Sequence, residues 1–244
     1  MYSIYIKEIV SFFASITGCV VIIVFLALTG WFMWLNPGEF NILDSGYANI
    51  DTLFFIAPWV FLFLIPAITM RSFAEERKTG TIELLLTYPT GEMQLVVAKY
   101  FAAITLILLS LTPCLVYYFT VYFIGNPVGN IDTGGVWGSF VGLFFLASAY
   151  ASIGIFVSSL TDSQIVAFIV SAVLCFFVYS GFDGIALLSP LKPVNTFLVS
   201  MGINEHYKSL SRGVIDLRDL IYFVALISIF IGGARLKLQS RRWQ

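Results

Sequence analysis

Six long apolar segments dominate this 244-residue sequence and limit what the chain can fold into. A helix that crosses the hydrocarbon core of a bilayer needs about 20 predominantly apolar residues. Six segments suit that requirement: residues 14–35, 52–70, 95–124, 136–160, 164–188 and 220–236. The chain is 59% hydrophobic and only 11% charged, which leaves too few charges to coat a water-facing surface. We therefore predict an all-α, polytopic membrane protein that forms one transmembrane domain over residues 1–244.

The positions of the basic residues predict how the six helices are oriented. Lysine and arginine accumulate in the cytoplasmic segments of membrane proteins. With a cytoplasmic N-terminus, nine of the thirteen basic residues lie inside: Lys7, Arg71, Arg77, Lys78, Lys99, Arg235, Lys237, Arg241 and Arg242. The other four belong to one outer loop, residues 189–219: Lys192, Lys208, Arg212 and Arg218. We therefore expect both termini inside, and an outer loop with room for one or two short helices.

The first residues of the chain differ from the spans that follow. Ser3, Lys7, Ser11 and Ser15 recur every four residues, and mainly apolar residues lie between them. A helix with one polar stripe on an apolar surface suits the headgroup plane of a bilayer. We predict an interfacial helix over residues 2–13. The alternative is that this segment is the irregular start of the first span.

Few residues in the sequence could support catalysis or ion transport. The chain has no Gly-x-x-x-x-Gly-Lys-Ser/Thr run to hold ATP phosphates and no His-Glu-x-x-His pair. Cys19, Cys114 and Cys175 are isolated in apolar runs, so we expect neither a metal site nor a disulfide. The spans are expected to lack buried charge: only Asp183 could lie at membrane depth, and a solvated loop suits it better. We predict no enzyme activity, no bound cofactor and no ion-coupled transport. An intramembrane enzyme with sparse motifs stays an alternative.

Small residues, prolines and one short turn predict how the spans meet. Small residues about four apart let helices pack closely, and such a series runs through Gly134, Gly138, Gly142, Ala147 and Ala151. Prolines can kink a helix, and three occur within the second and third spans: Pro58, Pro66 and Pro113. In the turn between the fourth and fifth spans, Asp162 or Ser163 can cap the fifth.

The densest group of charges lies between the second and third spans, in residues 71–93. Its first part reads Arg71-Ser-Phe-Ala-Glu-Glu-Arg-Lys-Thr-Gly80. In its second part, Ile82, Leu85 and Leu86 share one face of a predicted helix and Glu83 lies off that face. A short amphipathic helix between two spans suggests a docking surface for something outside the bilayer. The simpler interpretation is a solvated loop with no partner.

Residues 71–89 resemble the first cytoplasmic loop of ABC-2-type transporter permeases. In that family an acidic pair, then Gly-Thr, then Glu and a leucine run that ends at proline follow the second span. This sequence has Glu75-Glu76, Gly80-Thr81, Glu83 and the run to Pro89. Residues 154–164 and 212–219 are similar to the family's turn before the fifth span and its approach to the sixth. Within the family, the chain most resembles the permease subunit of the gliding-motility-associated ABC transporter.

The resemblance implies a division of labour between subunits. A separate ATP-binding ABC subunit would bind and hydrolyse ATP. The permease would pair with a second copy of itself or with a sister permease, and an auxiliary subunit with a periplasmic domain could join them. The expected location is the bacterial cytoplasmic (inner) membrane, in contact with lipid, and the role is export linked to gliding motility or associated secretion. No nucleic-acid partner is expected, because the chain has no basic block. The alternative is a membrane anchor or assembly subunit that moves no substrate.

The resemblance also implies which residues form the sites. The loop 71–93 would contain a cytoplasmic coupling helix seated in a groove of the ATPase. The expected ATPase-docking residues are Glu75, Glu76, Arg77, Lys78, Thr79, Gly80, Thr81, Glu83 and Leu84. Those expected to pack the coupling helix against the inner ends of the spans are Ile82, Leu85 and Leu86. The expected path-lining residues, from the second and fifth spans, are Phe55, Trp59, Phe63, Phe168 and Phe176.

Overall fold

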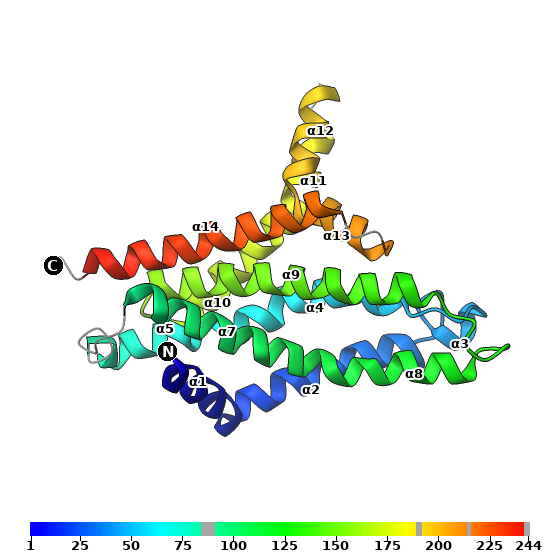
Figure 1. The fold of residues 1–244 in the computed structure, drawn as a ribbon, viewed down its shortest axis with the longest axis horizontal. Coiled ribbons are helices and arrows are strands. Elements are labelled where there is room, and N and C mark those ends of the chain that lie inside the picture. The colour runs from blue at the N-terminus through cyan, green and yellow to red at the C-terminus, as the bar shows by residue number, and fades with distance from the viewer. Residues whose placement is uncertain (84–90, 189–191, 214–215, 242–244) are drawn as a thin grey trace.

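The computed structural model describes residues 1–83, 91–188, 192–213 and 216–241, and these residues form helices with no strand among them. Six helical segments of the described chain are long and apolar enough to cross a membrane: Gly18–Leu35, Asp51–Lys78, Glu92–Ile124, Thr133–Leu160, Gln164–Leu187 and Leu217–Ser240. The predicted all-α, six-span architecture is therefore confirmed. The N-terminus and the last described residues of the final span lie at the same end of the bundle (Figure 1), which we call the terminal end. Which side of the membrane this end faces stays a prediction.

A separate N-terminal helix precedes the first span. Helix α1 (Tyr2–Ala14) ends at Ser15, whose extended backbone (φ −94°, ψ 130°) breaks the helix. Helix α2 (Ile16–Gly30) continues into a π-helical turn, Trp31–Leu35. The helix that contains the first membrane-capable segment, Gly18–Leu35, therefore begins at residue 16 and not at residue 14. Figure 1 shows α1 at an angle to α2.

The second and third spans are helical beyond the apolar runs. Helix α3 (Ile42–Ser45) leads to α4 (Asp51–Thr69), which contains Pro58 and Pro66 and is followed after Met70 by α5 (Arg71–Lys78). Helix α7 (Glu92–Leu111) meets α8 (Leu115–Ile124) at a 3-10 turn that contains Pro113. Proline has no N–H to donate to a helical hydrogen bond, which explains the interruption of the third span at this point.

The rest of the chain supplies three spans and the outer-loop helices. Helix α9 (Thr133–Leu160) is the fourth span, and α10 (Gln164–Phe176) continues through a π-helical turn, Phe177–Gly181, to α11 (Phe182–Leu188). The segment that we expect to form an outer loop contains two short helices, α12 (Lys192–Met201) and α13 (Ile203–Ser211), which we call the outer-loop helices. Helix α14 (Leu217–Arg241) is the last span. Helices α11 and α12 project from the bundle (Figure 1).

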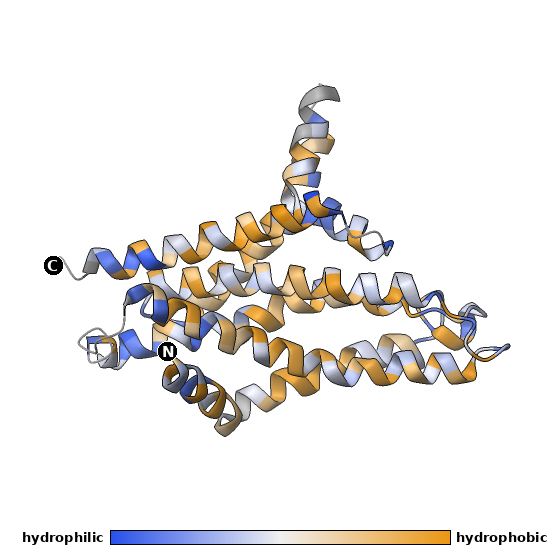
Figure 2. Cartoon of the chain, viewed as in Figure 1, coloured by the Kyte–Doolittle hydropathy of each residue, from blue (hydrophilic) through white to orange (hydrophobic). Residues whose placement is uncertain are grey.

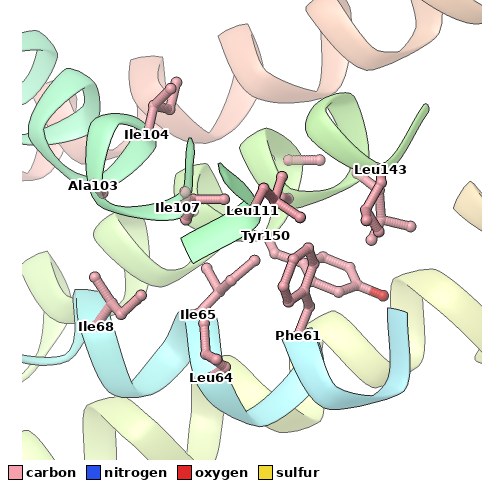
Figure 3. Packing of buried hydrophobic residues seen from close by; sticks show 14 of the residues in the cluster. Phe61, Leu64, Ile65, Ile68, Ala103, Ile104, Ile107, Leu111, Leu143 and Tyr150 are labelled. Atoms are coloured by element: carbon pink, nitrogen blue, oxygen red, sulfur yellow. The ribbon is translucent and has the colours of Figure 1, made fainter. Parts of the chain in front are cut away.

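Helix α9 lies at the centre of the bundle, where it packs against α4, α5, α7, α10, α13 and α14. Its small residues make this possible. A Cβ atom on Gly138 would lie 2.6 Å from the Cα atom of Gly213, and one on Gly142 would lie 2.9 Å from the Cβ atom of Leu210. Figure 3 shows the core beside α9, with Phe61 and Ile65 of α4 facing Ile107 of α7. The prediction that small residues in this span serve close packing is confirmed.

The outer-loop helices are joined to the last span by the chain's one histidine. His206 and Asp219 share a hydrogen bond between Nδ1 and Oδ1 at 2.7 Å, and both residues are buried. The other ring nitrogen lies 3.0 Å from the carbonyl oxygen of Ser200, and the imidazole stacks on Tyr222 with the ring centres 3.9 Å apart. His206 therefore connects α12, α13 and α14. Figure 2 shows that apolar residues cover the spans and that polar residues gather towards the ends of the bundle.

Candidate functional site

The charged segment after the second span begins as a helix. We expected helical spacing in its second part only, but the structure places Arg71–Lys78 in α5, directly after α4. The physical reason is local, since this stretch has no glycine or proline and is rich in good helix formers. Arg77 and Lys78 occupy the last turn, where positive charge suits the helix dipole. The helix ends before Gly80, whose left-handed φ of +73° favours glycine.

A serine of the fourth span fixes the start of α5. The hydroxyl oxygen of Ser158 accepts hydrogen bonds from the backbone N–H groups of Phe73 (3.0 Å) and Ala74 (3.1 Å). The same hydroxyl donates to the carbonyl oxygen of Met70 at 3.0 Å. The first N–H groups of a helix lack partners inside that helix, so this one side chain satisfies buried groups of α5 and ties them to α9.

We predict that Ser158→Ala lowers the free energy of unfolding by about 1–3 kcal/mol, because it leaves buried N–H groups without an acceptor. Thermal unfolding of the detergent-solubilised protein measures the effect. Ser159→Ala is the matched control, since the Ser159 hydroxyl donates only within its own helix, to the carbonyl oxygen of Phe156 at 2.6 Å. Equal stability losses in the two variants would contradict this role of Ser158.

The turn after α9 also holds α5. Arg77 Nε lies 2.6 Å from Asp162 Oδ1, and Arg77 Nη1 donates to the carbonyl oxygen of Ser159 at 2.6 Å. Ser163 is the N-cap residue of α10, but its side chain makes no capping hydrogen bond. The expectation that Ser163 caps the fifth span with its side chain is therefore wrong. Asp162 is paired with Arg77 of α5, so the turn joins α5 to the fourth and fifth spans.

Four charged side chains meet where α1, α5 and α7 come together, and we call Lys7, Glu8, Glu76 and Lys99 the charge cluster. Lys7 Nζ lies 2.8 Å from Glu76 Oε1, and Lys99 Nζ lies 3.0 Å from Glu76 Oε2. Lys99 Nζ also lies 2.6 Å from Glu8 Oε1. The two lysines and two glutamates balance in charge. The cluster ties the N-terminal helix to the start of the third span and to α5.

Lys99 is the central residue of the charge cluster. Its side chain is fully buried, and its ammonium group donates hydrogen bonds to Glu8 Oε1 and to the carbonyl oxygen of Ser72, each at 2.6 Å, while it forms an ion pair with Glu76. The ammonium also lies 5.0 Å from the ring centre of Phe73, within the range of a cation–π contact. The expectation that the spans contain no buried charge is wrong, because Lys99 lies within the predicted span 95–124. Asp183 is half-buried and accepts a hydrogen bond from Asn204 at 2.6 Å.

Sequence reasoning missed the charge cluster because its members are far apart in the chain. Glu8 and Lys99 are separated by 91 residues, and Lys7 and Glu76 by 69. The signal that could have revealed it was Lys99 itself, a lysine in an apolar segment that requires a partner.

The surroundings of Lys7 raise the pKa of its ammonium group. Partial burial works to lower the pKa of the Lys7 ammonium group. The hydrogen bond to Glu76 and the charges of Glu76, Glu8 and Glu75 outweigh it, so the pKa lies above its ordinary value. Lys7 is therefore charged at neutral pH and its pair with Glu76 is intact.

The structure divides the expected ATPase-docking residues into two groups. Glu76 and Arg77 are occupied inside the chain, in the charge cluster and in the turn after α9. The exposed members are Glu75, Lys78, Thr79, Gly80, Thr81 and Glu83. Of the residues expected to pack the coupling helix, Ile82 is buried in the core. Leu84, Leu85 and Leu86 lie outside the described residues.

Four of the expected path-lining residues form an aromatic stripe along α4 and α10: Phe55, Trp59, Phe63 and Phe176. Phe55, Trp59 and Phe63 follow one another at helical spacing on α4, and all three are exposed. Trp59 packs against Tyr179 with ring centres 5.6 Å apart, and its ring lies 6.5 Å from that of Phe176, also exposed. Phe168 is half-buried. The stripe lies on the outer surface of the single chain.

Comparison with known proteins agrees with this architecture. Residues 38–234, well over half of the chain, match the family model described as ABC-2 family transporter protein. The match begins after the first span and covers the charged segment, the aromatic stripe and the outer-loop helices. No curated protein shows significant sequence similarity to the chain.

Proposed function

We propose, from the premise that this chain belongs to the ABC-2 family of transporter proteins, that α5 and the residues after it couple ATP hydrolysis to transport. As a member of that family the chain is a permease subunit of an ABC transporter and works with an ATP-binding ABC subunit. In our proposal the permease binds no ATP itself. The partner hydrolyses ATP and exerts a force on the permease at the terminal end of the bundle.

The docking surface that supports this proposal is the exposed tip after α5. Glu75, Lys78 and Glu83 present both signs of charge, and Thr79, Gly80 and Thr81 form the turn between them. Charges on a rim give a contact its specificity and register. This surface lies at the terminal end, which the distribution of lysine and arginine places in the cytoplasm (Figure 1).

The contacts behind the tip suggest how movement would spread. Helix α5 directly follows α4, is hydrogen-bonded to α9 through Ser158, and is ion-paired to α1 and α7 through Glu76. A displacement of α5 would therefore be transmitted to the second, third and fourth spans and to the N-terminal helix. In this proposal Glu76 and Arg77 hold α5 to other parts of the chain, and the exposed residues make the contact with the ATPase.

The aromatic stripe on α4 and α10 supports the second part of the proposal. Phe55, Trp59, Phe63 and Phe176 are exposed in the single chain and Phe168 is half-buried, so a second permease copy or a sister permease could cover them and complete a route. We propose export across the bacterial inner membrane through that route. A link to gliding motility or associated secretion, with an auxiliary periplasmic-domain subunit, rests on the sequence resemblance alone.

Co-purification in mild detergent tests the proposal. We expect the tagged permease to retain a separate ATP-binding protein, and ATP hydrolysis to depend on that protein. If the permease alone hydrolyses ATP, or if no ATP-binding protein accompanies it, the proposal fails. If the complex assembles and hydrolyses ATP but moves no labelled cargo in vesicles, the chain is an anchor or assembly subunit.

A further inference from the structure

A pocket of about 260 Å³ lies beside the charge cluster, between α1, α4, α5 and α7. Its polar lining, which we call the polar wall, includes three cations, three carboxylates and two serines: Lys7, Arg71, Lys99, Glu8, Glu75, Glu76, Ser11 and Ser15. Its floor is apolar and includes Phe12, Ile68 and Leu106. The pocket therefore combines a charged rim with an apolar floor, at the terminal end of two membrane-spanning helices.

Helix α1 turns its polar stripe into this pocket. Lys7, Ser11 and Ser15, the polar residues that recur every four positions, line it. The opposite face of α1 is apolar and open, with Tyr2 at 75% and Val10 at 60% exposed. An outward apolar face suits the acyl region of a bilayer. We therefore infer that the pocket lies behind a helix whose apolar face contacts lipid, near the boundary between headgroups and hydrocarbon.

Among the described residues, Arg71 is the cation in the pocket that takes part in no ion pair. Lys7 and Lys99 are paired with Glu8 and Glu76 in the charge cluster. Glu75, one turn along α5, lines the same pocket but is exposed and forms no ion pair with Arg71. Arg71 Nη1 donates to Ser15 Oγ at 2.8 Å, but its Nε is buried and has no hydrogen-bond partner. A buried guanidinium N–H without an acceptor is costly, so the site favours an anion.

We propose that this pocket binds one glycerophospholipid, with the phosphodiester on Arg71 and the acyl chains along the apolar floor beside α1. Arginine suits phosphate because its planar fork donates parallel hydrogen bonds. Lys7 and Ser11, on the same wall, supply further donors. A free phosphate would use only the polar wall, whereas a phospholipid uses both. Bound lipid would fasten the N-terminal helix to the second and third spans.

Native mass spectrometry of the purified permease tests this proposal without the ATPase, so its outcome is independent of the proposed function. The protein is delipidated and titrated with palmitoyl-oleoyl phosphatidylglycerol in detergent micelles. We expect the wild type to retain one phospholipid, and Arg71→Gln to bind it about tenfold more weakly or worse, as loss of a charge-assisted hydrogen bond implies. The matched control is Arg235→Gln, which removes an exposed arginine from α14 near the same end and should leave binding unchanged.

Three results would overturn the proposal. The first is a delipidated wild-type protein that binds no phospholipid, which needs no variant to observe. The second is equal phospholipid binding by wild type and by folded Arg71→Gln. The third is displacement of the lipid by millimolar inorganic phosphate, which would show a site for a small anion only. If Arg71→Gln does not fold, Arg71→Lys replaces it. This variant keeps the charge without the fork, and we expect it to bind the lipid more weakly than wild type does.

Discussion

Lys99→Met is expected to destabilise the protein by about 3–5 kcal/mol, the effect of breaking a buried ion pair. The methionine is similar in length and apolar, but it leaves Glu8 and Glu76 facing each other with Lys7 as their one remaining cation in the charge cluster. It also leaves the carbonyl oxygen of Ser72 without the donor that reaches it at 2.6 Å. Thermal unfolding in detergent, or the denaturant midpoint, measures the loss.

Two further variants distinguish a broken ion pair from simple loss of a lysine. Lys78→Met removes an exposed lysine from the same region and should change stability by less than about 0.5 kcal/mol. The triple variant Lys99→Met, Glu8→Gln, Glu76→Gln removes the uncompensated charge and should recover much of the loss. A triple variant as unstable as Lys99→Met alone would show that packing, and not charge, gives Lys99 its importance.

Charge reversal at the exposed tip is expected to detach the ATPase while the spans remain folded. Glu75→Lys with Glu83→Lys replaces two negative charges by two positive ones beside Lys78. Like charges brought together across an interface cost several kcal/mol, so we expect association at least tenfold weaker. Both glutamates are exposed, so the unfolding temperature should stay within a few degrees of the wild type. Quantitative co-purification with the ATP-binding subunit measures the effect.

The matched control for this variant is Glu39→Lys, which reverses an exposed glutamate in the connection between the first two spans, before α3. It should leave the complex intact. A complex that survives the double reversal, or one that Glu39→Lys weakens equally, would contradict docking at the tip. Glu76 is unsuitable for this experiment, because its reversal would also break the charge cluster and unfold α5.

The sequence was sufficient to predict the six spans, because the apolar run that forms a membrane helix is recognisable within the segment itself. Twenty or so apolar residues in a row have few alternatives to a helix in hydrocarbon, where every backbone N–H and C=O group must be bonded within the chain. The helix of the first span begins at residue 16 and not at residue 14 because Ser15 breaks the helix there. The helices of the outer loop were also foreseen, but not their connection through His206 and Asp219.

The ion pairs and hydrogen bonds that hold α5 to the rest of the chain could not be predicted, because they depend on which helices become neighbours. Arg71–Lys78 is polar enough to suggest a solvated loop, and its burial follows only once α1, α7 and α9 surround it. Glu76 and Arg77 seemed suited to a partner for the same reason. Their charges are in fact matched by Lys7, Lys99 and Asp162 from three other parts of the chain. The exposed residues Glu75, Lys78 and Glu83 stay the predicted contact with the ATPase.

Site-specific crosslinking from position 83 tests most directly whether this permease receives its energy from a partner. A photoreactive residue replaces Glu83, which is exposed just beyond α5, and a second sample carries it at Glu39 as the control. In native membranes we expect position 83 to form a covalent adduct with an ATP-binding protein, and position 39 to form none. The account would be contradicted if position 83 gave no such adduct, or if it were labelled by a reagent that reaches only the outer side of the membrane.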